Sequence, residues 1–411
     1  MLLPISGAAA QTSSTVVYDQ EFFAQFPNAV SAADLIRRIP GGRRILDSRG
    51  GDARGFSRND DRILINGKRM SGKGNDSRSA LDRITVDQVE RIELIRGSSP
   101  DIKVSSQEAI LNIITRGTLS KGSGSWQAEA RITRDGRVQP GGFLSYGGTL
   151  GKLDYFASVK FEPENNITDR IEDIFDGAGQ LTKRIIESRK ESRNDGTASL
   201  NLSYNFENGN QLKLNGQFSE DGETFNQPGR FFEPDALGTL IEAGQAFRLE
   251  KLSRPRWEIG GDFEASLSDR FRLKILGLYS RTDETFRQGE DFEITGGSIE
   301  DDVLSIEDKL STEAIGRASL IWSIKPGSEL EFGSEFSLNK LTSGLAVFER
   351  VSGILEQQNV AASDTIVKET RNESFLIYTT KLSAKLSLEA SLFTEYSKIE
   401  QSGDAQNSRT F

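Results

Sequence analysis

The sequence contains neither cysteine nor histidine among its 411 residues. Without cysteine there is no disulfide framework and no thiolate nucleophile. Without histidine the chain lacks the most common general base and the most common protein ligand of transition metals. A carboxylate pair of the kind that hydrolyses glycosides is not excluded, but no spacing of Asp or Glu singles one out. We therefore expect no enzyme activity, no metal site and no cofactor.

The sequence also lacks an apolar run of the roughly 20 residues that a membrane-spanning helix needs. Its mean hydropathy is −0.46, and this excludes a helical integral membrane protein. A transmembrane β-barrel is not excluded, because its strands alternate apolar and polar residues and so keep a low average.

Basic residues are in the minority, with 51 Lys and Arg against 61 Asp and Glu and a net charge of −10. Nucleic-acid binding relies on clustered Lys and Arg that neutralise phosphates. Nucleic acid is therefore not an expected partner, and the acidic balance alone indicates only solubility.

The N-terminus combines an apolar stretch with small residues. Met1–Gln11 (MLLPISGAAAQ) resembles the end of a secretory signal peptide without its basic front, and the alternative is a simple disordered leader. We expect residues 1–10 to be the remainder of a signal peptide, residues 11–118 a small domain and residues 119–411 a β-rich region.

The small domain shows short helix and strand patterns in alternation. Residues 28–40 have helical spacing with Ser31 as N-cap, and Pro40–Gly42 ends this helix. The Asn66-Gly67 pair that follows one apolar run is a strong turn signal. The patterns predict an α+β domain of roughly a hundred residues. Strands are predicted at 63–65, 91–96 and 109–115, with short helices at 80–84 and 85–90.

From Gly124 onward, apolar residues recur at every second position. Runs such as 153–161 and 198–206 have one apolar and one polar face, as strands of about ten residues do in a transmembrane barrel. A soluble β-sandwich has the same alternation, so the periodicity alone leaves both open.

Loop lengths favour the barrel. Short turns at 151–152, 207–210, 268–270 and 325–328 alternate with long polar segments near 163–195, 221–254, 283–312 and 341–372, which we interpret as loops. Outer-membrane barrels combine short periplasmic turns with long external loops, and soluble domains seldom have so many long loops. We count about eleven strands, whereas plugged barrels have about 22. We therefore expect an incomplete barrel, about half of a 22-stranded one.

Five segments of the small domain stand out: Ala33–Gly41 (ADLIRRIPG), Arg54–Phe56 (RGF), Ile63–Arg69 (ILINGKR), Val89–Gly97 (VERIELIRG) and Asn112–Arg116 (NIITR). In order and spacing they resemble the plug domain of TonB-dependent outer-membrane receptors. The resemblance is specific over residues 16–118 and generic beyond them. It implies an α+β plug domain followed by an antiparallel transmembrane β-barrel. In one departure from the family, Gln107–Leu111 (QEAIL) stands where a Gly-rich approach to the last plug strand is usual.

The resemblance also implies three sets of site residues. Plug residues that meet a polar barrel lumen can pair with inward carboxylates, and the alternative for each arginine is a solvated surface charge. The polar segment 71–79 is a candidate ligand-facing loop or, equally, a mobile solvated loop. No clear TonB-contact box precedes the domain, and residues 15–17 are either that contact or an ordinary first strand. The plug–barrel candidates are Arg54, Phe56, Arg91 and Arg96; the ligand-facing candidates are Lys73, Asn75, Asp76 and Arg78; the TonB-contact candidates are Val16 and Val17.

In function, the resemblance implies an importer in the bacterial outer membrane, surrounded by outer-membrane lipid. Its partners would be TonB, the energy transducer of the inner membrane, and a scarce small-molecule or oligosaccharide ligand such as a ferric siderophore, a cobalamin-like molecule or a glycan. Two alternatives are an outer-membrane signal transducer, which needs an additional N-terminal domain, and a soluble secreted β-rich protein that binds carbohydrate.

Overall fold

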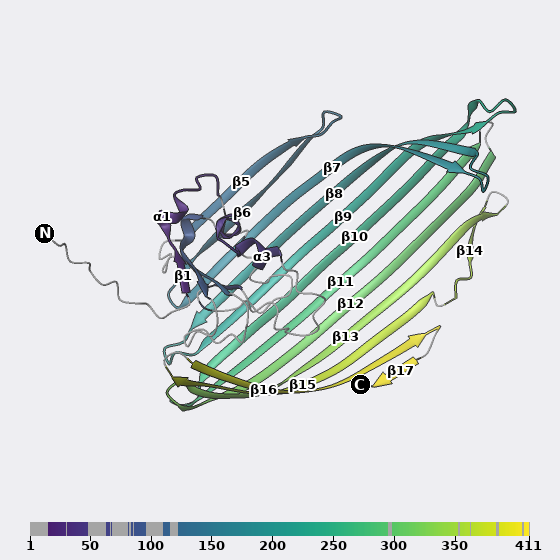
Figure 1. Ribbon diagram of the computed structural model, residues 1–411. Coiled ribbons are helices and arrows are strands. Elements are labelled where there is room, and N and C mark those ends of the chain that lie inside the picture. Colours follow the sequence, from purple (N-terminus) through teal and green to yellow (C-terminus); the bar gives the residue numbers. More distant parts are fainter. Residues whose placement is uncertain are drawn as a thin grey trace.

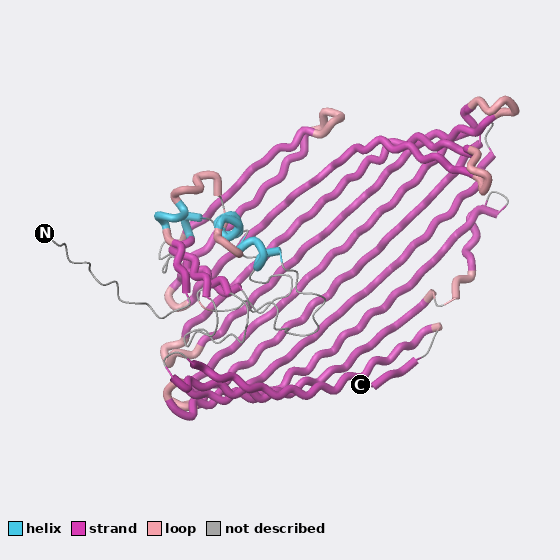
Figure 2. Tube along the Cα trace, in the orientation of Figure 1, coloured by secondary structure: helices cyan, strands magenta, loops and turns pink. Residues whose placement is uncertain are grey.

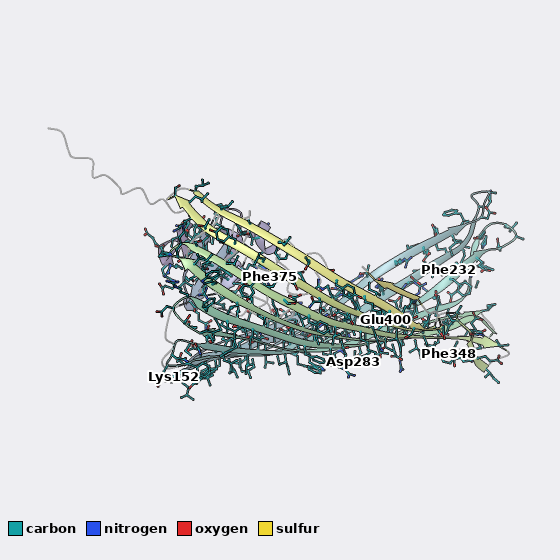
Figure 3. All side chains as sticks on the ribbon, turned by 90° about the horizontal axis from the view of Figure 1, so that it is seen from below. Lys152, Phe232, Asp283, Phe348, Phe375 and Glu400 are labelled. Carbon is teal, nitrogen blue, oxygen red and sulfur yellow. The ribbon has the colours of Figure 1, made fainter. Side chains whose placement is uncertain are left out.

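The chain forms a small N-terminal domain and a large, curved antiparallel sheet (Figures 1 and 2). The computed structural model describes residues 15–29, 31–47, 63–65, 67, 81, 84, 86–95, 110–115, 122–294, 298–351, 354–361, 363–383, 386–404 and 407–410. The N-terminal domain lies at the end of the large sheet that carries Lys152 (Figures 1 and 3). This arrangement confirms the predicted fold class, an α+β domain followed by antiparallel strands. None of the described helices is long and apolar enough to cross a membrane.

The N-terminal domain is built on a four-stranded sheet in the order β1-β3-β4-β2. β3 runs antiparallel to β1 and β4, whereas β2 is parallel to β4. Its hydrophobic core is formed by side chains that are almost completely buried, among them Leu35, Ile36, Ile92 and Leu111. The strands are β1 (Thr15–Tyr18), β2 (Ile63–Ile65), β3 (Val89–Ile95) and β4 (Ile110–Thr115), and the helices are α1 (Gln20–Phe23), α2 (Ala32–Arg38), α3 (Gly42–Asp47) and the 3-10 helix η2 (Val86–Gln88).

The predicted helix at 28–40 is confirmed as α2, with Ser31 as its N-cap. The Asp34 amide donates to the Ser31 hydroxyl at 3.3 Å, and the Ser31 amide donates to the Asp34 carboxylate at 3.2 Å. This reciprocal capping box satisfies two amides that a helix start leaves without partners. α2 ends before Pro40 as expected. The predicted helix at 85–90 is shorter than expected, because β3 begins at Val89, and the one at 80–84 lies mostly outside the described residues.

The large sheet contains thirteen described strands, and strands adjacent in sequence pair antiparallel. The exception is β14, a short branch that pairs with β13, while β13 also pairs with β15. The sheet curves like part of a barrel wall (Figure 3). Its strands are β5 (Ser123–Ile132), β6 (Val138–Leu150), β7 (Leu153–Phe175), β8 (Leu181–Asn205), β9 (Gln211–Pro234), β10 (Leu240–Ser266), β11 (Phe271–Ile294), β12 (Ser298–Lys325), β13 (Ser328–Val351), β14 (Ile354–Gln358), β15 (Asp364–Ser383), β16 (Leu386–Gly403) and β17 (Asn407–Thr410).

The interpretation of the long polar segments as loops is wrong. β10 has 27 residues and β12 has 28, so the strands continue through most of these segments. The hairpins close in tight turns: the Asp176 carboxylate accepts from the amides of Ala178 and Gln180, and Gly179 supplies a positive φ of 79°. Asp235 and Gly238 build the same turn between β9 and β10.

Cross-strand ion pairs explain why polar segments stay extended. The Arg184 guanidinium contacts Asp173 at 2.6 and 2.7 Å, and Arg193 contacts Glu223 at 2.7 Å. Opposite charges on neighbouring strands stabilise a sheet. The polar residues therefore bind each other across the ladder, and an apolar face is not required for pairing.

Candidate functional site

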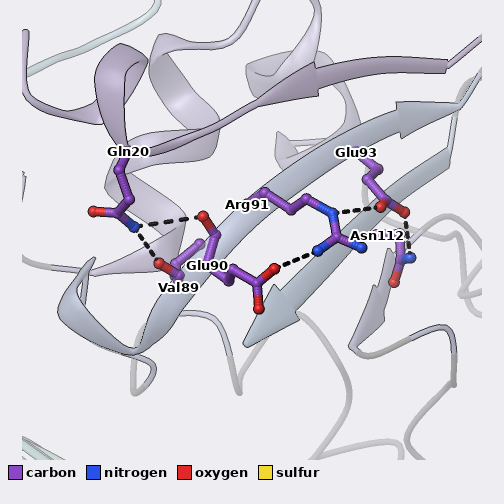
Figure 4. A network of polar contacts seen from close by, with 6 residues as sticks. All are labelled: Gln20, Val89, Glu90, Arg91, Glu93 and Asn112. Carbon is purple, nitrogen blue, oxygen red and sulfur yellow. Dashed lines mark hydrogen bonds and ion pairs between the residues drawn. The ribbon is translucent and has the colours of Figure 1, made fainter. Parts of the chain in front are cut away.

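A polar network crosses the sheet of the N-terminal domain (Figure 4). The Arg91 Nε donates to Glu93 at 2.8 Å, and the side-chain amide of Asn112 donates to the other oxygen of Glu93 at 2.8 Å. The Asn112 carbonyl oxygen in turn accepts from the Gly67 amide at 2.8 Å. Asn112 is buried within a strand whose other residues, apart from the terminal Thr115, are apolar. The network therefore connects β3, β4 and the turn after β2, and it uses both ends of the Asn112 side chain.

Further polar contacts of the same strand hold α1 in place. Arg91 also pairs with Glu90, and the hydrogen bond to Glu93 is the main reason why the pKa of Arg91 is raised above its ordinary value. The Gln20 side chain in α1 donates to the carbonyl oxygens of Val89 and Glu90 at the start of β3. The α1 segment is thereby held against β3 (Figure 4).

The structure describes three of the predicted site residues. Val16 and Val17 lie in β1, opposite Leu94 and Glu93, and their exposed fractions are 41 % and 53 %. Arg91 forms its ion pairs with Glu90 and Glu93, both in its own strand. The other predicted residues lie outside the described residues; they are Arg54, Phe56, Arg96, Lys73, Asn75, Asp76 and Arg78.

One face of the large sheet is apolar and exposed. Side chains at alternate positions on different strands have exposed fractions of 44 % to 63 %, including Val159, Leu214, Ile259, Ile275 and Leu392. Monomeric soluble proteins rarely expose large contiguous apolar patches. The alternation places the polar residues of these strands on the opposite face.

Aromatic side chains mark both borders of this apolar band. On the border away from Lys152, the ring centres of Trp257 and Tyr279 are 5.1 Å apart. On the border near Lys152, the rings of Phe271 and Trp322 stack with their centres 6.0 Å apart. Eight residue steps separate Phe271 from Tyr279 on β11. This is about 27 Å along a strand, or about 20 Å of depth at a tilt of about 40°. The aromatic borders of the band resemble those of membrane barrels, and this depth is somewhat smaller than the apolar band of about 25 Å that such barrels have.

The opposite face is polar, and some of its charges are buried. Arg371 contacts Glu335 at 3.0 Å and Glu395 at 3.7 Å, and Glu335 lies 3.8 Å from Arg317. The guanidinium of Arg317 also lies 4.2 Å from the centre of the Phe375 ring. Both partners of the central pair have side chains about 5–6 % exposed. Because each charge has a partner, the wall tolerates this burial.

A hollow of about 360 Å³ opens on the same polar face. Residues from β10 to β15 line it, among them Arg256, Glu258, Glu313, Asn339 and Glu369. The Asn339 amide donates to Glu369 at 3.0 Å. No group of acidic side chains in the described part of the chain has an arrangement that suits a metal ion. The hollow is a polar surface that can form hydrogen bonds and ion pairs.

Sequence reasoning missed the two networks. Asn112 is a single amide inside the apolar run Ile110–Thr115, and such an isolated polar residue is itself a signal for a buried hydrogen-bond network. Glu335 and Arg371 stand at polar-face positions of paired strands. Their pairing depends on the strand register, which alternation alone does not provide.

The N-terminal part of the chain matches a known family. Residues 8–110 match the family model described as TonB-dependent Receptor Plug Domain. This region is similar to the plug domain of TonB-dependent receptors, and we refer to it as the plug domain. The plug domain thus carries the network of Arg91, Glu93 and Asn112, and the large sheet follows it with its apolar face outward.

No curated protein matches the chain. Among solved structures, the chain is similar to the siderophore receptor PiuA from Acinetobacter baumannii, at 14 % identity and a TM-score of 0.44, over 97 % of this chain and 61 % of that one. The ferric-catecholate import receptor Fiu from E. coli K12 matches at 10 % identity and a TM-score of 0.33, over 95 % of this chain and 78 % of Fiu. The ferric yersiniabactin uptake receptor FyuA from Yersinia pestis matches at 11 % identity and a TM-score of 0.29, over 95 % of this chain and 73 % of FyuA. The assignment of the plug domain rests on the family model.

Proposed function

We propose that the protein is an outer-membrane receptor that binds a scarce nutrient and imports it into the periplasm with energy from TonB. The plug domain is the observation that carries this proposal, because plug domains belong to TonB-dependent receptors. The exposed apolar band of the sheet supports a membrane location and argues against a soluble carbohydrate-binding protein. No covalent chemistry is part of the proposed function.

Three ligand classes follow from the family: ferric siderophores, cobalamin-like molecules and glycan fragments. The test is uptake of one labelled representative of each class by cells with and without the gene, in strains with and without TonB. We expect uptake of one class that needs both proteins and stops when an uncoupler collapses the proton gradient. Uptake that persists without TonB would overturn the proposed mechanism.

The membrane location has a separate test. The protein should float with outer membranes in a density gradient and should change its mobility in SDS gels only after heating. Release from cells without detergent would instead support the soluble alternative.

We also propose that TonB reaches the plug domain near Val16 and Val17. Both side chains are exposed, and β1 is an edge strand of the described plug sheet, so a partner can approach them. Because the chain has no cysteine, Val17→Cys introduces a unique thiol for cross-linking to a cysteine placed in TonB. The control is Glu21→Cys, because Glu21 is also exposed but lies on α1. Equal cross-linking of both variants would contradict the contact.

The remaining predicted residues stay proposals. A contact of Arg91 with the sheet wall would have to form in addition to its pairs with Glu90 and Glu93. Double-mutant cycles between Arg91 and wall carboxylates would measure that coupling. The ligand-facing role of Lys73, Asn75, Asp76 and Arg78 is tested by the loss of ligand binding in a variant with all four replaced by alanine.

A further inference from the structure

A row of basic side chains borders the apolar band on its outward face. Lys340 on β13, Lys368 on β15 and Lys398 on β16 lie on the strand faces that also present Leu338 and Tyr396. The alternation along each strand sets this orientation. Glu400 on β16 lies at the same level, between the ends of the sheet marked by Lys152 and Phe348 (Figure 3). The row therefore lies where the band ends and the projecting strands begin.

The register brings two of these cations directly opposite each other. Lys340 is the cross-strand partner of Lys368, and Lys368 is the partner of Glu400. Glu400 already forms an ion pair with Lys398 at 2.8 Å. Neither Lys340 nor Lys368 forms an ion pair with any carboxylate of the described residues. Like charges that face each other on neighbouring strands destabilise a sheet, and an anion placed between them would remove that cost.

Apolar side chains lie directly below this pair. Phe336, Leu338 and Tyr396 have exposed fractions of 45 %, 46 % and 56 %. A ligand that fits both parts has a phosphate at one end and hydrocarbon at the other. We propose that Lys340, Lys368 and Lys398 bind the phosphate of a phosphorylated membrane lipid, whose acyl chains lie over Phe336, Leu338 and Tyr396.

The position of the row favours a lipid over a dissolved phosphate. The row lies on the outward face of the sheet, next to the band that the bilayer covers, and not on the polar face that holds the ion-pair networks. Basic residues next to a membrane-embedded segment attract anionic headgroups. The inference rests on the proposed membrane location and does not depend on which nutrient the receptor imports.

Lipid binding by the refolded full chain tests this inference. Native mass spectrometry would count bound lipid in detergent with added phosphatidic acid, and phosphatidylcholine would be the reference lipid. In the Lys340→Gln/Lys368→Gln variant we expect affinity for phosphatidic acid to fall about 30-fold, because each basic residue near a charged lipid surface contributes a factor of about five. The preference over phosphatidylcholine should shrink by the same factor, because only Lys398 remains.

The matched control is the Lys190→Gln/Lys251→Gln variant, which removes the same charge from exposed side chains farther from the apolar band. We expect this control to bind like the wild type, and inorganic phosphate at equal concentration not to displace the lipid. An equal loss in the control, an unchanged test variant or displacement by inorganic phosphate would each overturn the inference. A failure of the proposed membrane location is distinguishable, because the wild type would then bind neither lipid.

Discussion

The plug domain and the large sheet use the same apolar residue types in opposite ways. In the plug domain, Ile92 and Leu111 are completely buried between helices and sheet. In the large sheet, Ile275 and Leu392 are exposed, while Glu335 and Arg371 are buried on the other face. This difference is the one expected if the large sheet lies in a membrane, as proposed above. Water drives apolar side chains into a core, whereas a bilayer is as apolar as leucine and drives polar groups to the lumen side.

The largest expected difference between the regions is in the stability lost when a leucine is replaced by alanine. Leu111→Ala should destabilise the plug domain by about 2–5 kcal/mol, because it leaves a cavity in a packed core. Leu392→Ala should have little effect, since Leu392 is 63 % exposed and leaves no cavity. Denaturant titrations followed by hydrogen exchange of β3, β4 and β16 amides would measure both. Similar losses in the two regions would contradict the comparison.

A charge on the apolar band tests the membrane side of the comparison. Ile275 lies midway between the aromatic borders at Phe271 and Tyr279 on β11. Ile275→Arg should cost about 2–4 kcal/mol of folding free energy in a bilayer. Folding yields in lipid vesicles, read from heat-dependent gel mobility, would show the loss, with Ile275→Leu as control. If the arginine variant folds as well as the control, this face does not meet lipid.

Removing one partner of a buried polar network should matter more than removing both. Asn112→Leu leaves the Gly67 amide without its acceptor and one oxygen of the Glu93 carboxylate without its donor, while Arg91 still contacts the other oxygen, at a cost of about 1–3 kcal/mol to the plug domain. Ser158→Ala/Ser199→Ala removes both partners of a 2.8 Å hydrogen bond on the polar face of the sheet. That double change should be nearly neutral. The free energies of unfolding of the two variants decide this, and a stabilising Asn112→Leu would refute the role of the network.

The smallest effect concerns pH. Burial, together with a hydrogen bond to Glu223, raises the pKa of Glu191 on the projecting part of β8. A raised carboxyl pKa means that ionisation opposes folding, so the wild type loses stability as pH rises above the ordinary glutamate value of about 4.3. Glu191→Gln should therefore unfold at a higher temperature than the wild type at pH 8, and this advantage should vanish at pH 4. Thermal melts at both values would test it, and a pH-independent difference would count against the assignment.

Local signals predicted the plug domain well. The capping residue Ser31 and the spacing of Leu35 and Ile36 predicted α2, and apolar runs predicted β2, β3 and β4. α3 was not predicted, because Pro40–Gly42 was interpreted only as an end. Gly41 adopts a φ of 86°, and a Cβ on Gly42 would lie 2.1 Å from the Ile36 carbonyl oxygen. These glycines let a second helix start against the end of the first.

The alternation of apolar and polar residues predicted the strands of the large sheet, but not how long they are. Apolar alternation ends where the band ends, so the polar continuations gave no strand signal. Their extension depends on pairs such as Arg248–Glu290, whose members lie far apart in sequence. The polar networks of the candidate site were missed for the same reason. Cross-strand partners become visible only once the register is known.

The extended polar strands have a consequence for the energetics of ligand capture. A flexible loop that closes over a ligand loses conformational entropy at that moment, and the loss subtracts from affinity. Residues of β7 to β13 have already lost this freedom on folding, because they are paired across the ladder and closed by turns such as the one at Asp176. A molecule that docks against these strands meets a preorganised surface. Its binding should therefore cost little conformational entropy of the protein, and its association should be fast.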